Sequence, residues 1–238
     1  MYEIWRRFRR RYVRPFFGRF QSWRSATYGG IRVHYKRHLD GGGTGFGQDF
    51  IPFLRGRGMP KQARAFEWCA GPAFIGFSML GHGLCETLCL ADINPQAVAA
   101  CRRTIEDNAL GARVSLYQSN GLNDIPPSER WDLVVSNPPH FVDAYAGELR
   151  THDPGWSIHR DFFSKIGALL KPNGVVVLQE NNAGSTAETF RDMIEQAGLS
   201  IVFVDGCIPQ RTPDHRFYYI GIMRRGDTPP AWAASRAN

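Results

Sequence analysis

Apolar segments of strand length alternate with helical patterns between residues 63 and 224, and this alternation restricts the fold more than any other feature of the chain. The strand-like segments lie near 63–68, 87–91, 112–117, 131–136, 174–179, 200–205 and 216–224. The helical patterns lie near 74–82, 95–109, 157–170 and 185–197. Such alternation produces βαβ units. We therefore predict an α/β fold with a doubly wound, Rossmann-like sheet of seven strands. The sheet is mostly parallel, and its last strand is antiparallel because a loop rather than a helix precedes it.

One domain of this type is expected over residues 28–225, because 238 residues with 43% apolar side chains suffice for one sizeable core. Residues 28–35 alternate as in a hairpin, and a glycine-rich loop follows them. Residues 226–238 contain two prolines and small side chains, so we expect a flexible tail there. Residues 1–27 are expected to form a basic, aromatic N-terminal arm.

The positive charge of the chain is concentrated at its N-terminal end. Residues 1–38 carry eleven Arg or Lys and one acidic residue, a balance of +10 in a total of +7, so the other 200 residues have a balance of −3. Aromatic residues recur in the arm at helical spacing: Trp5, Phe8, Tyr12, Phe16, Phe20 and Trp23. Three roles of the arm remain open, namely a lid on the domain, a nucleic-acid contact through phosphates and stacked bases, and a membrane-surface helix.

The chain shows no run of about eighteen uncharged apolar residues and no signal-peptide pattern, so we predict no transmembrane segment and a cytoplasmic location. Its five cysteines include no CxxC pair, which is typical of reduced thiols. The histidines show no metal-ligand spacing, and we predict no metal site. The oligomeric state is not predicted.

The loop after the first strand of the alternation indicates a cofactor site. The segment Glu67-Trp68-Cys69-Ala70-Gly71-Pro72-Ala73 has one glycine where a dinucleotide site needs three, and its proline lacks an N–H for a pyrophosphate. Glu67 instead suits the ammonium of an amino-acid cofactor. Asp92 ends the next strand, 25 residues later, where a carboxylate suits two ribose hydroxyls. These features predict S-adenosylmethionine.

A third loop, Gln118-Ser119-Asn120-Gly121, follows the third strand. In this fold that loop borders the adenine ring, so Asn120 is a candidate for hydrogen bonding to the exocyclic amino group. An ordinary Asn-Gly turn is the alternative interpretation.

Asn137-Pro138-Pro139-His140 directly follows a buried strand and indicates the chemistry. Neither proline can donate to a sheet, so the chain turns and leaves polar groups at the carboxyl edge. The Asn137 side-chain carbonyl and the Pro138 backbone carbonyl can each accept one N–H of a planar NH₂ group. This fixes the nitrogen and aims its lone pair at a methyl carbon. His140 is expected to stack on the planar acceptor rather than to act as a general base.

These segments resemble the HemK/PrmC branch of class I S-adenosylmethionine-dependent methyltransferases. The matching pieces are Glu67–Ala73, Asp92–Ala97, Asn137–His140, Leu178–Asn181 and, in place of that family's gate segment, Phe46–Pro52. The resemblance implies cofactor contacts from Glu67, Gly71, Asp92 and Asn120 and acceptor contacts from Asn137 and Pro138. His140 stands where tyrosine or phenylalanine is usual, and the arginine-rich arm stands in place of the helical recognition domain of the release-factor enzymes.

The expected site residues fall into three groups. Catalysis is assigned to Asn137, Pro138 and His140. Cofactor binding is assigned to Glu67, Cys69, Ala70, Gly71, Asp92, Ile93, Asn120, Gly121 and Asn137. Substrate binding is assigned to Phe46, Gln48, Pro139 and Phe141.

The predicted function is N-methylation of an amide, guanidine or aromatic amine in a small molecule or peptide, because the acidic domain favours a small or cationic acceptor. One alternative is an RNA base methyltransferase that uses residues 1–27. A second alternative is a non-catalytic methyltransferase-fold subunit that stabilises a partner.

Overall fold

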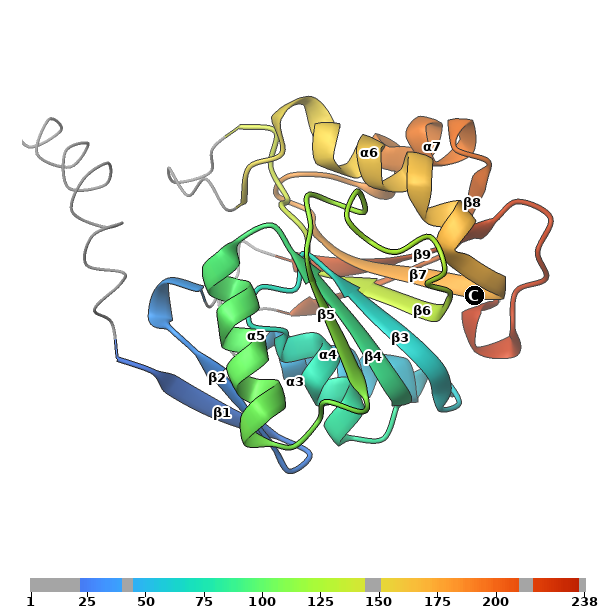
Figure 1. Ribbon diagram of the computed structural model, residues 1–238. Helices are drawn as coiled ribbons and strands as arrows, with labels where there is room; N and C mark the ends of the chain where they lie inside the picture. Colours follow the sequence, from blue (N-terminus) through green and yellow to red (C-terminus); the bar gives the residue numbers. More distant parts are fainter. Residues whose placement is uncertain (1–21, 40–44, 144–150, 210–215, 236–238) are drawn as a thin grey trace, which may run out of the picture.

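A computed structural model of the protein describes residues 22–39, 45–143, 151–209 and 216–235. Its centre is a seven-stranded sheet with the order β5-β4-β3-β6-β7-β9-β8 (Figure 1). The strands are β3 (Gln62–Trp68), β4 (Cys85–Asp92), β5 (Val114–Gln118), β6 (Trp131–Ser136), β7 (Leu170–Asn181), β8 (Leu199–Pro209) and β9 (Arg216–Arg224). All neighbours pair parallel except at β9, which is antiparallel to β7 and β8. The predicted mostly parallel sheet with an antiparallel last strand is confirmed.

Helices cover both faces of the sheet (Figure 1). The helices are α3 (Phe46–Gly56), α4 (Phe74–Gly81), α5 (Pro95–Asp107), α6 (Ser157–Ile166) and α7 (Ala187–Gln196), with short 3₁₀ turns at Arg37–Leu39, Pro154–Trp156, Gly167–Leu169 and Ala231–Ala233. One core lies under α3, α4 and α5, and a second lies under α6 and α7. The start of α5 follows from its sequence, because Asn94 accepts a hydrogen bond from Gln96 N at 3.0 Å and proline occupies the first turn.

A separate two-stranded hairpin, β1 (Arg24–Tyr28) and β2 (Ile31–Tyr35), precedes the sheet. Its turn residue Gly29 has φ +51°, and a Cβ there would lie 2.3 Å from the backbone of Gly81. The hairpin therefore lies directly on the end of α4, and only glycine fits at this contact. Residues 24–27, which we placed in the arm, belong to β1.

Trp23 is the one aromatic residue of the predicted arm stripe that the structure describes. Lys36 lies over its ring at 5.2 Å and Arg103 of α5 at 4.9 Å. Cations over an indole ring are attracted by its π electrons. This end of the stripe is thus attached to the domain, and residues 1–21 lie outside the described part.

The segment after β9, which we expected to be a flexible tail over residues 226–238, is hydrogen-bonded through its backbone to Arg57 at the end of α3. Arg57, which is buried, donates to Trp232 O at 2.8 Å, Ala234 O at 2.7 Å and Asp205 Oδ2 at 2.5 Å. Trp232 is buried as well. Prolines and small residues suggested a tail, but one long-range arginine supplies the partners that fix this backbone.

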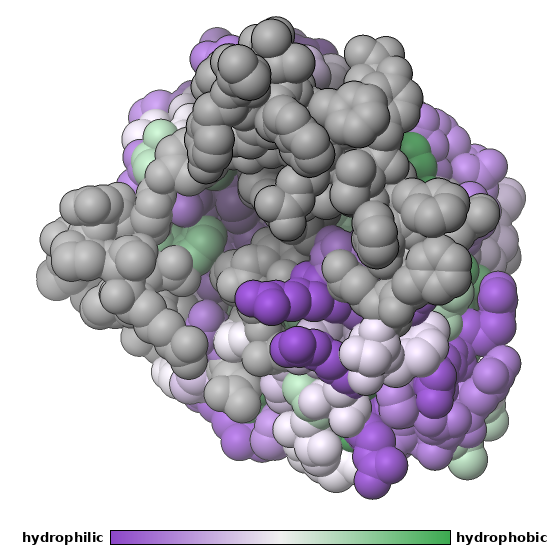
Figure 2. Space-filling view, turned by 90° about the vertical axis from the view of Figure 1, so that its left-hand side faces the viewer, coloured by the Kyte–Doolittle hydropathy of each residue, from purple (hydrophilic) through white to green (hydrophobic). Residues whose placement is uncertain are grey.

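Figure 2 shows a face of the molecule on which the coloured residues are mostly hydrophilic and the hydrophobic patches are small and separate. Among the described residues, no helix has the length and apolar character that crossing a membrane requires.

Candidate active site

The strand order reverses between β3 and β6, and the loops after these strands form the centre of the site. Trp68 at the end of β3 pairs with Ser136 at the end of β6, and the Ser136 hydroxyl donates to Trp68 O at 2.6 Å. The chain then leaves β3 toward β4 on one side and leaves β6 toward β7 on the other. Open α/β sheets bind ligands in the crevice that such a reversal leaves. The predicted cofactor loop, which follows Trp68, and the Asn137-Pro138-Pro139-His140 turn, which follows Ser136, therefore begin side by side.

The first loop, residues 69–73, has an unusual backbone. Cys69, Gly71 and Ala73 have φ of +52°, +53° and +61°. The left-handed region costs a residue with a Cβ about 1–2 kcal/mol, so the surrounding contacts must hold the loop. Ala70 N donates to Ala91 O of β4 at 3.0 Å, and Ala73 N donates to Ala70 O at 2.7 Å. The result is a compact backbone turn at the carboxyl ends of β3 and β4.

Glu67 is buried below this loop, and its carboxylate faces the start of α4. Oε2 accepts the Gly76 N–H at 2.6 Å, which replaces the side-chain cap that α4 lacks. Burial raises the pKa of Glu67 to about 8, although the Gly76 and Ile75 N–H groups favour the charged form. A Cβ on Gly76 would lie 2.6 Å from this oxygen, so a larger residue there would displace the carboxylate.

Asp92 connects the first loop with its neighbours. Its Oδ2 accepts Gly71 N at 2.7 Å and its Oδ1 accepts Asn94 N at 2.8 Å, which leaves a second lone pair on each oxygen. Burial raises the pKa of Asp92, and these two N–H bonds oppose the rise. The following Ile93 is 61% exposed, an unusual position for an isoleucine beside a loop junction.

The third loop also meets Asp92, because Ser119 N donates to Asp92 O at 3.0 Å. Asn120 is exposed, and its backbone N donates to Asp124 at 3.3 Å. Gly121 has φ +61°, so the loop is a real Asn-Gly turn. The predicted cofactor residues after β3, β4 and β5 thus lie along one stretch of the sheet edge. This stretch offers the exposed apolar side chain of Ile93, the carboxylate of Asp92 and the compact backbone of residues 69–73. These groups fit S-adenosylmethionine.

Asn137 begins the second signature. Its side chain is partly buried, and its Oδ1 is shielded from solvent without a hydrogen-bond partner among the described residues. Pro138 is buried and Pro139 is partly buried. Buried acceptors without a donor are rare in native proteins and need an explanation.

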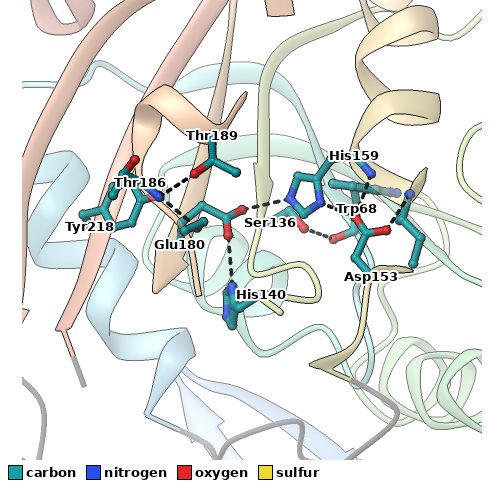
Figure 3. A network of polar contacts seen from close by, with 11 residues as sticks. Trp68, Ser136, His140, Asp153, His159, Glu180, Thr186, Thr189 and Tyr218 are labelled. Carbon is teal, nitrogen blue, oxygen red and sulfur yellow. Dashed lines mark hydrogen bonds and ion pairs between the residues drawn. The ribbon is translucent and has the colours of Figure 1, made fainter. Parts of the chain in front are cut away.

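His140 is anchored by a chain of buried ionisable groups (Figure 3). Its Nδ1 lies 3.1 Å from Glu180 Oε2, and Glu180 Oε1 lies 3.0 Å from His159 Nε2. His159 Nδ1 in turn lies 2.6 Å from Asp153 Oδ2. Burial alone would lower the pKa of His159, but Glu180 and Asp153 raise it to about 9. His159 is therefore a cation between two carboxylates at neutral pH.

Sequence reasoning missed this network. The spacing of the histidines along the chain gave no sign of it, because His159 meets Asp153 and Glu180 only in the folded protein. In the structure both carboxylates are fully buried and engaged by His159. Asp153 also accepts Ile158 N at 2.8 Å at the start of α6. The network fixes the Asn-Pro-Pro-His turn against β7 and α6.

The predicted substrate residues are distributed differently. Phe141 is buried: its N–H donates to Thr151 O at 2.9 Å, and a Cβ on Gly184 would lie 2.7 Å from its ring. It thus supports the turn from inside the protein. Phe46 and Gln48 lie in the first turns of α3, and their side chains lie outside the described part. No metal-binding cluster of His, Cys, Asp or Glu occurs within the described ranges.

A family model described as "Methyltransferase small domain" matches residues 54–199, more than half of the chain. The chain belongs to the methyltransferase small domain family. The match begins at the end of α3 and includes every loop of the site described above. This methyltransferase domain has the predicted HemK-like, S-adenosylmethionine-dependent character, and the predicted cofactor is confirmed with it.

Two kinds of curated relatives resemble this methyltransferase. The release factor glutamine methyltransferase of Caulobacter vibrioides is 28% identical over 46% of this chain and 47% of that protein. The ribosomal RNA small subunit methyltransferase C of Shewanella sp. is 29% identical over 61% of this chain and 36% of that protein. The chain therefore spans about half or less of the length of these relatives.

A solved structure shows the same fold. The 16S rRNA N2 G1207 methyltransferase of T. thermophilus, in complex with AdoMet and guanosine, has a TM-score of 0.55 and 14% identity over 86% of this chain and 50% of that chain. At this identity, the likeness concerns the arrangement of the sheet and helices.

The pKa of Glu67 makes stability depend on pH. Because the pKa of about 8 in the folded protein exceeds the ordinary glutamate pKa of 4.5, the free energy of unfolding falls as pH rises between them, by up to about 1.4 kcal/mol per pH unit. Glu67→Gln should lack this slope between about pH 5 and 6.5, as measured by urea unfolding. The exposed Glu86→Gln on β4 is the control and should keep it. Equal slopes in the wild type and Glu67→Gln would contradict the assignment.

The network around His159 supplies a second prediction. His159→Phe keeps the ring that stacks on Phe190 at 4.7 Å but leaves Asp153 and Glu180 without their shared cation. We expect unfolding at pH 7 to become about 3–5 kcal/mol easier, and the triple variant Asp153→Asn/His159→Phe/Glu180→Gln to recover part of this loss. Since the pKa of His159 is raised from 6.5 to about 9, its contribution in the wild type is lost as pH rises through that window. A His159→Phe protein of wild-type stability would exclude a structural role of the charge.

Proposed function

We propose that the protein transfers a methyl group from S-adenosylmethionine to a planar nitrogen, in an amide, guanidine or aromatic amine of a small molecule or peptide. The observation that carries this proposal is the buried, unpartnered Oδ1 of Asn137, next to the cofactor loop. A ligand N–H is the donor that this oxygen lacks.

The nitrogen of such a group is a poor nucleophile because its lone pair is delocalised. Asn137 Oδ1 and the Pro138 carbonyl each accept one of its N–H groups, which holds the nitrogen and favours a pyramidal geometry. The lone pair then forms the new C–N bond as the C–S bond breaks, and the nitrogen releases one proton to solvent. Orientation and electrostatics supply most of the rate enhancement.

S-adenosylmethionine supplies an electrophilic methyl group on a positively charged sulfur. In this proposal Asp92 would hold the ribose hydroxyls through its remaining lone pairs, and the exposed Ile93 would contact the adenine. Gly71 and its neighbours Cys69 and Ala70 are small enough for their backbone to approach the cofactor closely. Asn120 and Gly121 border the adenine edge.

His140 forms a wall of the acceptor site in this proposal. Glu180 holds its Nδ1, and its ring lies 5.5 Å from that of Phe217, so the imidazole has one fixed orientation. A fixed aromatic ring can stack on a planar acceptor without losing rotamer entropy at binding.

An RNA base is the second candidate acceptor. This candidate is supported by a relative named as a ribosomal RNA small subunit methyltransferase, which is 29% identical over 61% of this chain. The arginine-rich residues 1–21 would then hold phosphates.

The proposed transfer chemistry is tested with radiolabelled S-adenosylmethionine and three acceptor pools: total RNA, glutamine-containing peptides and small guanidines or arylamines. One pool should yield an N-methylated product. Asn137→Ala should lower kcat by about 10²–10³-fold, whereas Asp92→Ala should weaken cofactor binding as measured by calorimetry. Asn173→Ala, at an exposed position in the far end of β7, is the matched control. A methyl group on carbon or oxygen, or full activity of Asn137→Ala, would overturn the proposal.

The role of the arm separates the two acceptor classes. The truncation should remove residues 2–21 only, because β1 begins at Arg24. If RNA is the acceptor, log Kd for RNA should rise steeply with log salt, and the slope should become shallow in the truncated protein. An unchanged slope would place RNA binding elsewhere, and undetectable RNA binding would favour the small or peptide acceptor.

A further inference from the structure

A second buried carbonyl oxygen, on Gln179, lies beside the turn that carries the proposed chemistry. Gln179 is fully buried, and its Oε1 has no hydrogen-bond partner among the described residues. The preceding residue of β7, Leu178, pairs with Ser136 of β6. The next residues along these parallel strands are Gln179 and Asn137, so the two side chains leave neighbouring strands at the same level of the sheet edge.

The amide of Gln179 is held at its nitrogen end by one hydrogen bond. Its Nε2 donates to the hydroxyl of Tyr219 at 3.0 Å, and Tyr219 lies directly opposite it on β9. The Tyr219 ring is itself fully buried and stacks on Phe53 of α3 at 3.7 Å. Burial raises the pKa of Tyr219, so the hydroxyl stays neutral. Because Nε2 is engaged, Oε1 is the end of the amide that is left to accept.

The surroundings do not explain a polar group at this place. Val135 on β6 and Val177 on β7 precede Asn137 and Gln179 on the same face, and both belong to the apolar core. An unpaired acceptor in such surroundings is unfavourable, whereas leucine at position 179 would continue the core. Two such oxygens, one on β7 and one directly after the end of β6, therefore point to one ligand that donates to both.

We infer that Gln179 is a specificity-determining residue that accepts an N–H adjacent to the reacting NH₂ group. The inference rests on the proposed role of Asn137. The matching acceptors carry an NH₂ group beside a second N–H, as guanidinium groups and 2-aminopyrimidinone edges do. A carboxamide has an oxygen beside its NH₂ group. This oxygen would face Oε1 of Gln179, and the lone pairs of the two oxygens would repel each other. Unpaired or repelling buried groups are the strongest means of rejecting such an analogue.

The test uses the full-length protein saturated with S-adenosylhomocysteine and titrated by calorimetry with three probes. Guanosine and N-methylguanidinium represent the two sources of the donor edge, and acetylglutamine methylamide represents the carboxamide. The variants are Gln179→Leu, which removes the acceptor, Gln179→Glu, which keeps one, and Tyr219→Phe, which releases the amide. Ser78→Ala, which removes another buried and unpartnered oxygen in the middle of α4, is the control.

At least one donor-edge probe should bind the wild type about tenfold or more tightly than the carboxamide does. Gln179→Leu should abolish that ratio, Gln179→Glu should preserve it for N-methylguanidinium, Tyr219→Phe should reduce it, and Ser78→Ala should leave it unchanged. A wild type that prefers the carboxamide, that binds no donor-edge probe, or whose ratio survives in Gln179→Leu would overturn the inference. Loss of S-adenosylhomocysteine binding would instead count against the proposed function, so the two failures are distinguishable.

Discussion

The parallel pairing of β3 with β6 is the constraint on which the whole site depends. It places the ends of the two strands at one level, and the bond from Ser136 Oγ to Trp68 O holds that level at the last residue of each strand. The loop at residues 69–73 and the turn at Asn137 start from these residues. A register shift of one residue would move every following side chain to the opposite face of the sheet. The adjacency of the two signatures therefore follows from this strand pair, not from the loops.

The position of α4 is the second condition, and close glycine contacts set it at both ends. Gly76 lets the Glu67 carboxylate reach the start of the helix, and Gly81 accommodates the hairpin turn at Gly29. Side chains at these positions would push the helix away from the sheet and the hairpin. Because α4 is held in place, the point at which residues 69–73 enter the helix is fixed. This explains how Ala73 keeps its φ of +61° although it is not a glycine.

Most of the fold could be predicted from the sequence, because the hydrophobic periodicity of strands and helices is a local property of the chain. Long-range polar pairs have no such period. Asp153 lies on a loop, His159 on a helix and Glu180 on a strand. Their spacing in the sequence does not indicate that the imidazole of His159 contacts both carboxylates. The same holds for Arg57 and the backbone near Trp232, which turned a predicted tail into an attached segment. One local signal was present and overlooked: Gln179 directly continues the buried run Val175–Leu178, where a polar side chain is unexpected.

The two faces of β7 carry opposite kinds of polar group, and the contrast separates structure from function. Glu180 faces α6 and α7, and each of its oxygens has an imidazole partner. A network satisfied in this way stabilises one conformation and leaves no oxygen of Glu180 unpaired for a ligand. Gln179, one residue earlier, faces the opposite core with one end of its amide engaged and the other end open. Since adjacent strand residues point to opposite faces, the strand anchors His140 from one side and presents an acceptor oxygen from the other. A single strand thus holds the turn rigid and selects what is bound beside it.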